Sequence, residues 1–231
     1  MARRTRLILF DVDGTLLSSG PGWRAAFGSA LADVFGTSGD LDHFAFEGKL
    51  DPLIVAELMR GAGVSEEAVA EGLPRALALY LDRLETALAV ERPRTKPRVP
   101  ELLERVAGNP SAVTALLTGN VERGARIKLS AAGLWHRFRF GAFGDEASRR
   151  EELGPVALSR ARAATGIAFE GPDCVVVGDA PQDVACGHAL GARVVAVATG
   201  KTPAAALAAA GADVVLPDFG DLDATVGALF G

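Results

Sequence analysis

Short apolar segments alternate with helical segments through most of this sequence, and this alternation restricts the possible folds more than any other feature. The expected strands cover residues 7–10, 112–117, 138–143, 174–178, 194–197 and 213–216. The expected helices between and after them cover residues 121–132, 153–165, 181–190, 203–210 and the C-terminus. Short buried strands joined by helices form a parallel sheet covered on both faces. We therefore predict a doubly wound, Rossmann-like α/β core.

A helical stretch interrupts this alternation directly after the first expected strand. Helices are expected at 22–35, 51–59 and 65–90, with Ser65 as the capping residue of the third. Residues 92–100 then contain three prolines and four cations, which is typical of a linker. The sequence thus predicts an α/β core made of residues 1–17 and 93–231. The predicted insert is an α-helical cap domain of residues 18–92.

Composition and charge exclude several other classes of protein. The net charge of −5 argues against non-specific binding to nucleic acid. Cys174 and Cys186 lack the spacing of a zinc site and are typical of reduced thiols. The basic start at residues 1–4 precedes an apolar run too short for a signal peptide, and no segment has the length of a membrane span. We expect a cytoplasmic protein without membrane or nucleic-acid partners, of unknown oligomeric state.

Polar side chains follow three of the expected strands. Asp11 and Asp13 follow the first strand, Thr118 follows the second, and Asp179 and Asp183 follow the fourth. Ligands of such sheets bind at the carboxyl ends of the strands, so these side chains are expected in one pocket. Clustered carboxylates repel one another unless a cation relieves them, and oxygen ligands suit Mg²⁺. Each aspartate could instead cap the helix that follows it. Helix capping alone does not account well for four aspartates at the ends of separate strands.

These motifs and their order resemble the haloacid dehalogenase-like hydrolase superfamily, its phosphatases in particular. The DxDGT signature corresponds to residues 11–15, the second motif to Thr118, and GDxxxD to residues 178–183. The helical insert lies where phosphoglycolate phosphatase-like members place a small α-helical cap. The resemblance covers nearly the whole chain and implies a hydrolase of this type.

The resemblance also implies roles for the strand-end residues. Asp11 is expected to attack phosphorus and form an aspartyl-phosphate intermediate. Asp13 is expected to protonate the leaving oxygen and then to activate water. Thr118, with Gly119 and Asn120, is expected to bind the phosphoryl oxygens. The implied reaction is hydrolysis of a small phosphorylated metabolite.

The same resemblance implies a magnesium site. Asp11, Asp179 and the backbone carbonyl of Asp13 are the expected ligands, with Asp183 supporting the ion through water. Phosphoryl transfer depends mainly on positioning and on neutralising charge, which agrees with this assignment. Mg²⁺ is therefore the expected cofactor.

One motif departs from the family pattern. The third motif usually provides a Lys, but the corresponding segment contains none. Arg150 is the expected replacement, with Arg149 as the alternative, because arginine also supplies a fixed positive charge that fits phosphate. In the insert, Lys49 and Arg24 are expected to meet an anionic leaving group.

Other activities share parts of this pattern. Dehalogenases of 2-haloacids use the same nucleophile but need neither Mg²⁺ nor an acid at position 13, so Asp13 argues against that activity. Phosphomutases share the first motif and differ in keeping the phosphoryl group. A non-enzymatic phosphoacceptor protein is a further alternative, against which the long helical insert argues. A catalytically silent scaffold protein is the last, and the missing Lys of the third motif is the only hint of it.

Overall fold

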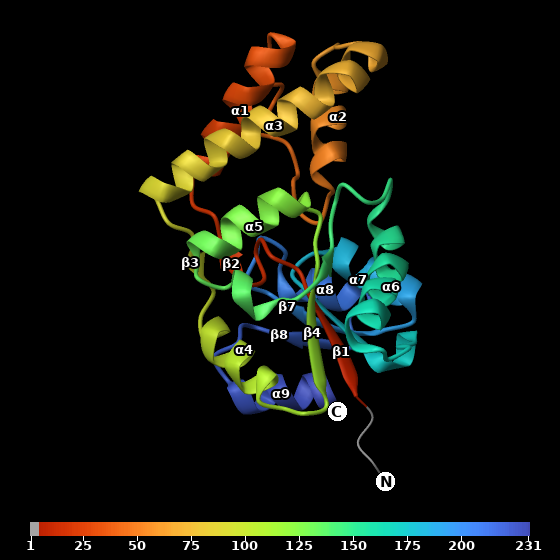
Figure 1. Cartoon of the computed structure of the whole chain (residues 1–231). Coiled ribbons are helices and arrows are strands. Elements are labelled where there is room, and N and C mark those ends of the chain that lie inside the picture. Colours follow the sequence, from red (N-terminus) through yellow and green to blue (C-terminus); the bar gives the residue numbers. More distant parts are fainter. Residues whose placement is uncertain (1–4) are drawn as a thin grey trace.

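A six-stranded parallel sheet runs through the lower half of the molecule (Figure 1). The computed structural model describes residues 5–231, so the basic start of the chain lies outside the described residues. In spatial order the strands are β5 (Gly141–Ala142), β4 (Ala112–Leu117), β1 (Arg6–Phe10), β6 (Cys174–Gly178), β7 (Arg193–Val197) and β8 (Val214–Leu216). The predicted doubly wound α/β fold is confirmed.

The first strand lies at the centre of the sheet. β1 pairs with β4 on one side, where Leu9 faces Ala115, and with β6 on the other, where Leu9 faces Val176. Along the chain, β4 and β5 are added on one side of β1, and β6, β7 and β8 are then added on the other side. The carboxyl ends of β4, β1 and β6 therefore lie next to one another, which is where such folds bind ligands.

Helices cover both faces of the sheet because its strands bury alternate side chains on opposite sides. Ile8 and Phe10 belong to one apolar cluster, and Leu7 and Leu9 belong to the other. The first layer contains α4 (Val99–Ala107), α5 (Glu122–Ala131) and α9 (Leu222–Phe230). The second contains α6 (Leu153–Thr165) and α7 (Pro181–Leu190), and α8 (Ala204–Ala209) packs beside α7 and β8.

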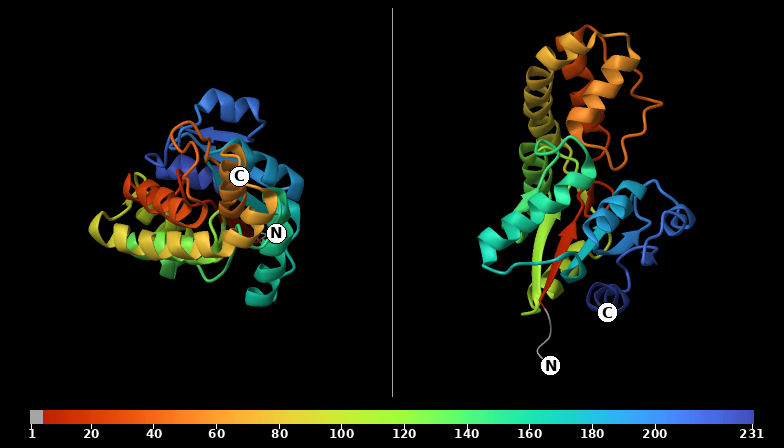
Figure 2. Two further views of the ribbon diagram at one scale, coloured as in Figure 1. Left: turned by 90° about the horizontal axis from the view of Figure 1, so that it is seen from above. Right: turned by 90° about the vertical axis from the view of Figure 1, so that its right-hand side faces the viewer.

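Three helices form the insert, which stands over the carboxyl ends of the strands (Figure 2). They are α1 (Gly22–Phe35), α2 (Asp51–Gly61) and α3 (Glu66–Val90). The Ser65 hydroxyl caps α3 by accepting the amide hydrogen bond of Ala68 at 3.3 Å. The insert helices share an apolar cluster, in which Phe27, Met59 and Leu84 are buried and which Val121 of the core joins beside α5. This cluster is distinct from the two at the sheet and supports the division into core and cap, whose boundaries at residues 18 and 92 stay a prediction.

The two crossings between sheet and insert lie side by side. β2 (Leu17–Ser18) pairs antiparallel with β3 (Arg94–Thr95), so the chain leaves and re-enters the core at one place. The expected linker at 92–100 therefore contains a strand and the first turn of α4. None of the described helices combines the length and apolar character needed to cross a membrane.

Two expected elements differ from the structure. The strand expected at 138–143 is limited to Gly141–Ala142, because residues 135–137 form a 3₁₀ turn and only Leu116 and Leu117 offer partners to it. The helix α4 was not anticipated, since it begins among the prolines of the expected linker, where Pro100 occupies a first-turn position that tolerates proline.

We expect the insert core to be sensitive to the loss of a single large side chain. Replacing the fully buried Leu84 of α3 by alanine should lower the free energy of unfolding by about 2–5 kcal/mol, because a cavity remains among the insert helices. Urea denaturation followed by circular dichroism measures this change. On the same helix, Val90→Ala removes an 88 % exposed side chain and should change stability by less than about 0.5 kcal/mol. Equal losses for both variants would contradict the assigned packing of α3.

Candidate active site

The strand ends and the insert enclose one cavity of about 310 Å³. Its floor is formed at the ends of β1, β4 and β6, where Asp11, Thr118 and Asp179 line it. Its roof is formed by insert residues such as Phe46 and Tyr80. The structure thus brings the strand-end residues predicted from the sequence to a single site.

Three carboxylates form the acidic centre of this site. Asp11, Asp179 and Asp183 are buried, and each offers an oxygen within 4.8 Å of the others. The backbone holds Asp11 at the strand end through an amide hydrogen bond to the Val177 carbonyl at 2.9 Å. Asp179 Oδ1 accepts a hydrogen bond from the Thr15 hydroxyl at 2.8 Å. The cluster is therefore fixed by its neighbours.

Two glycines leave room for Asp179. A Cβ atom on Gly14 would lie 2.3 Å from Asp179 Oδ2, and one on Gly200 would lie 1.7 Å from the same oxygen. Gly14 also has a φ of 86°, which side-chain-bearing residues rarely adopt. A residue with a side chain at position 14 or 200 would therefore collide with the Asp179 carboxylate.

Arg150 is the cation beside the acidic centre. Its guanidinium donates to Asp11 Oδ1 at 2.9 Å, to Asp183 Oδ1, and to the Gly48 carbonyl of the insert at 3.1 Å. The side chain is buried at the start of the short turn that precedes α6. Arg149, in contrast, is exposed and pairs with Glu152 at 3.2 Å. The structure places Arg150, and not Arg149, beside Asp11.

The electrostatics of the three carboxylates favour a bound cation. Burial, with the charge of Asp183 next, raises the pKa of Asp11 well above its usual range, although Arg150 opposes this. Burial and the charges of Asp11 and Asp183 likewise raise the pKa of Asp179. Such shifts mean that the ionised cluster is unfavourable unless further positive charge is supplied.

The donor set fits a hard divalent ion. All three donors are oxygens, and Asp11 Oδ2 and Asp179 Oδ2 have no hydrogen-bond partner among the described residues. Asp183 differs, because Oδ1 accepts from Arg150 and Oδ2 accepts the Ala180 amide hydrogen bond at 3.0 Å. Oxygen ligation of this kind suits Mg²⁺. Asp11 and Asp179 thus each keep one carboxylate oxygen available for an ion, whereas both oxygens of Asp183 are engaged.

Asp13 lies in a different environment from Asp11, although only one residue separates them. Its Oδ2 accepts hydrogen bonds from Lys128 at 2.6 Å and from Asn120 at 2.8 Å, and its Oδ1 accepts one from Ser19 at 2.9 Å. Burial opposes ionisation, but the Lys128 charge and these hydrogen bonds outweigh it and hold the pKa of Asp13 below its usual value. Asp13 is therefore a carboxylate in this structure.

The buried Lys128 was missed in the analysis of the sequence. Burial alone would lower the pKa of its ammonium, but the charges of Asp13 and Asp51 raise it, so the group is cationic. Helical spacing could have revealed this residue, because it shares one face of α5 with the buried Ala125 and Leu129. A lysine on the apolar face of a helix needs a buried partner.

The loop after β4 holds the insert against the core. Gly119 accepts the amide hydrogen bond of Asp51 at 2.8 Å, and Asp51 Oδ2 accepts that of Val121 at 2.9 Å. Burial raises the pKa of Asp51 to about 6. A Cβ atom on Gly119 would lie 2.0 Å from the Lys49 carbonyl oxygen, so this approach requires glycine. Thr118 and Asn120 line the cavity on either side of it.

The two insert cations proposed from the sequence differ in position. Lys49 lines the cavity and forms an ion pair with Glu57 of α2. Arg24 is not among the cavity residues. It donates to the Leu41 carbonyl at 2.5 Å and lies 5.1 Å from the ring centroid of Phe46.

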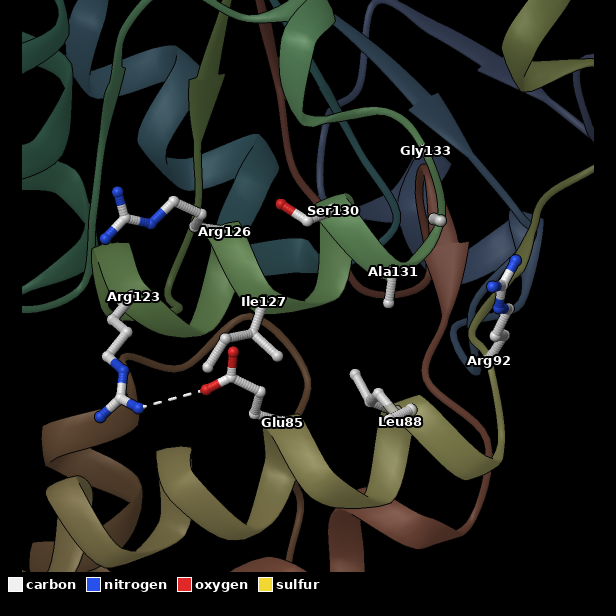
Figure 3. Close-up of a pocket in the computed structure, with 11 residues that line it drawn as sticks. Glu85, Leu88, Arg92, Arg123, Arg126, Ile127, Ser130, Ala131 and Gly133 are labelled. Carbon is white, nitrogen blue, oxygen red and sulfur yellow. Dashed lines mark hydrogen bonds and ion pairs between the residues drawn. The ribbon is translucent and has the colours of Figure 1, made fainter.

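A second hollow of about 720 Å³ lies on the outside of the molecule, between α3 and α5 (Figure 3). An ion pair of 3.4 Å between Arg123 and Glu85 crosses it, and Leu88 and Ile127 line it. None of the strand-end residues reaches this hollow. We therefore assign the candidate active site to the smaller cavity, which the strand-end side chains line.

The fold and the aspartate centre together define a protein with a parallel α/β sheet, a helical insert and a buried acidic site between them. The sequence model of the haloacid dehalogenase-like hydrolase family matches residues 8–188, and the chain belongs to this family. A phosphoglycolate phosphatase of Rhodospirillum rubrum is 30 % identical, over 94 % of this chain and 89 % of that protein. Phosphoglycolate phosphatase 1 of Pseudomonas aeruginosa is 28 % identical, over 95 % and 79 %.

Solved structures share the whole architecture. The crystal structure of a hydrolase from Pseudomonas syringae covers 99 % of this chain and 100 % of its own, with a TM-score of 0.73 at 22 % identity. A structure of a protein from Rhodobacter sphaeroides, in complex with phosphate, covers 94 % and 96 %, with a TM-score of 0.71 at 19 % identity. The insert and the sheet thus form one recurring arrangement.

We expect Asp179→Asn to stabilise the metal-free protein and to weaken its response to Mg²⁺. The asparagine keeps an oxygen for Thr15 but removes one of three repelling charges, so the free energy of unfolding at pH 8 should rise by roughly 1–2 kcal/mol. Because the pKa of Asp179 is raised in the folded protein, protonation of this residue favours the folded state at low pH. This contribution to the free energy of unfolding is lost as the pH rises through the native pKa. Wild-type stability in EDTA should therefore fall more steeply from pH 5 to 8 than that of the variant.

Thermal unfolding with and without Mg²⁺ measures both effects. The wild-type melting temperature should rise with the Mg²⁺ concentration, and that of Asp179→Asn should rise much less. Asp223→Asn, at an exposed position outside the site, should behave as the wild type. The same Mg²⁺ response in wild type and Asp179→Asn would exclude Asp179 as a ligand.

We expect Arg150→Met to destabilise the protein strongly. The substitution leaves Asp11 and Asp183 buried without their cation, which should lower the free energy of unfolding by about 3 kcal/mol at pH 8. Urea denaturation in EDTA measures the loss. Arg149→Met removes an exposed ion pair and should leave stability unchanged. A larger loss for Arg149→Met than for Arg150→Met would reverse the assignment.

Proposed function

We propose that this protein is a Mg²⁺-dependent phosphatase that hydrolyses a small phosphomonoester through an aspartyl-phosphate intermediate. The observation that carries the proposal is the meeting of Asp11, Asp179 and Arg150 with Asp13 and Thr118 at the ends of three adjacent strands. Membership of the hydrolase family and the names of the relatives support it.

In the first step, Asp11 attacks the phosphorus atom of the bound substrate. The backbone hydrogen bond to Val177 and the ion pair with Arg150 aim its carboxylate into the cavity. Thr118 and the loop after it bind the oxygens of the phosphoryl group. Phosphoryl transfer requires this positioning and the neutralisation of charge spread over the oxygens.

Asp13 handles the proton in both steps. It protonates the leaving oxygen when Asp11 is phosphorylated, with the proton that its carboxyl group took from water in the previous turnover, while Lys128, 2.6 Å from Asp13 Oδ2, holds the side chain in place. In the second step, the carboxylate form of Asp13 takes a proton from the water that hydrolyses the intermediate. The low pKa of Asp13 favours this second role.

The residues at the acidic centre fit Mg²⁺. Asp11 and Asp179 would hold the ion with the backbone carbonyl of Asp13, and Asp183 would support it while keeping Arg150 in place. When bound, Mg²⁺ supplies the positive charge that draws the substrate phosphate towards the carboxylates. Arg150 provides fixed charge beside Asp11, in the position where the family usually has lysine.

We expect Asp11→Asn to abolish the proposed activity, because the amide is a poor nucleophile. Hydrolysis of p-nitrophenyl phosphate, measured as released p-nitrophenolate, should require Mg²⁺ and stop on addition of EDTA. In Asp11→Asn, kcat/KM should fall by more than about 10³-fold.

Asp223→Asn is the matched control, since it changes an exposed aspartate that pairs with Arg105 on the surface. Its kcat/KM should equal that of the wild type. Full activity of Asp11→Asn would refute the assigned nucleophile. Absence of phosphate release from every phosphomonoester tested would refute the proposed function.

A further inference from the structure

The roof of the active-site cavity is aromatic. Trp23 and Phe46 meet edge to face with ring centroids 5.1 Å apart, and Phe27 and Tyr80 meet in the same way at 4.9 Å. Together with Ile54, these side chains line the cavity from the insert. Rings that pack against one another form a rigid apolar surface. A further apolar group can pack on this surface with little loss of conformational entropy in the protein.

The cations around the cavity are already engaged. In the described part of the chain, each cation that lines it has an oxygen partner. The pairs are Lys49 with Glu57, Lys96 with the Thr199 carbonyl, Lys128 with Asp13, Arg150 with Asp11 and Lys201 with Glu47. Arg150 and Lys128 serve the phosphoryl end of the site. Of the other described cations, Lys49 and Lys201 are paired with carboxylates, and Lys96 donates to a neutral carbonyl.

Two carboxyl groups of the insert lie at the same end of the cavity. Asp51 is buried at the start of α2, and Glu47 lies in the loop before it; both line the cavity. A carboxylate on the leaving group would lie near these groups and would have to compete with Glu57 for Lys49 and with Glu47 for Lys201, which is unfavourable. A neutral leaving group avoids this repulsion.

The cavity also contains a polar group without a partner. No hydrogen bond joins the Tyr80 hydroxyl to another described residue, although Tyr80 lines the cavity and is 3 % exposed. This hydroxyl can donate to, or accept from, a neutral polar group of a ligand. The volume of about 310 Å³ is at the small end of the range for small-molecule sites.

We infer that the substrate is a phosphomonoester of a small uncharged alcohol with an apolar body, and not of a carboxylated alcohol such as glycolate. The inference rests on the proposed phosphatase function and adds the class of leaving group. It separates this chain from relatives named for phosphoglycolate, whose leaving group carries a carboxylate. The paired state of Lys49 and the aromatic roof carry the distinction.

Two pairs of substrates test the inference with purified enzyme and Mg²⁺. Phosphoglycolate and phosphoglycolamide have nearly the same shape and differ in the charge of the leaving group. Benzyl phosphate and ethyl phosphate differ in apolar body. We expect kcat/KM to be at least about tenfold higher for phosphoglycolamide and for benzyl phosphate within their pairs. A kcat/KM for phosphoglycolate that equals or exceeds that for the amide would overturn the inference.

Variants then test the residues that carry it. Glu57→Gln frees Lys49 from its carboxylate partner and should reduce the preference for the amide at least about threefold. Glu66→Gln, which breaks an exposed ion pair with Arg60, should leave this preference unchanged. Phe46→Ala should lower the ratio of benzyl to ethyl phosphate turnover. An unchanged amide preference in Glu57→Gln would refute the assigned role of the Lys49 pair.

The outcomes separate this inference from the proposed function. If no substrate, including p-nitrophenyl phosphate, releases phosphate, then the phosphatase assignment itself fails. If phosphate is released and phosphoglycolate is preferred, then only the class of leaving group is wrong. Because every comparison is a ratio of substrates on one enzyme preparation, partial unfolding of a variant does not change the result.

Discussion

The contact of Arg150 with Asp11 and Asp183 is the interaction on which the rest of the site depends. Three buried carboxylates at the ends of two strands would repel one another, and this guanidinium relieves part of that repulsion. Arginine suits the position because its planar head donates to several acceptors at once. The same head also reaches Gly48 of the insert. One side chain thereby joins the end of β1, the first turn of α7 and the insert above them.

The two aspartates of the first motif have opposite pKa shifts because their surroundings differ. Asp11 faces other carboxylates and has a raised pKa, whereas Asp13 faces Lys128, Asn120 and Ser19 and has a lowered one. Carboxyl groups with opposite shifts in one site are suited to different tasks. Asp11 is placed beside the cluster that calls for a metal ion, and Asp13 lies in a network of proton donors. The proposed division into nucleophile and acid–base group follows from these surroundings.

The sequence was informative where function depends on strand ends and less so where it depends on side-chain pairing. The convergence of Asp11, Thr118 and Asp179 could be predicted because parallel strands end at one edge of the sheet. Strands of two residues, such as β2 and β3, are too short for any periodicity. The partner of Lys49 was not predictable, because the loop and α2 must fold against each other before Glu57 meets it. Lys128 was predictable in principle from the buried face of α5.

The insert contacts the core through the same residues that are proposed to bind phosphate. Gly119 accepts the amide hydrogen bond of Asp51 and lies against the Lys49 carbonyl, while Arg150 holds Gly48. The loop proposed to bind the phosphoryl group therefore also fixes the position of the aromatic roof above it. A change in the loop before α2 must alter both the fit of the leaving group and the position of the phosphoryl-binding backbone. Selection of the leaving group and the chemical step are thus coupled through one short stretch of chain.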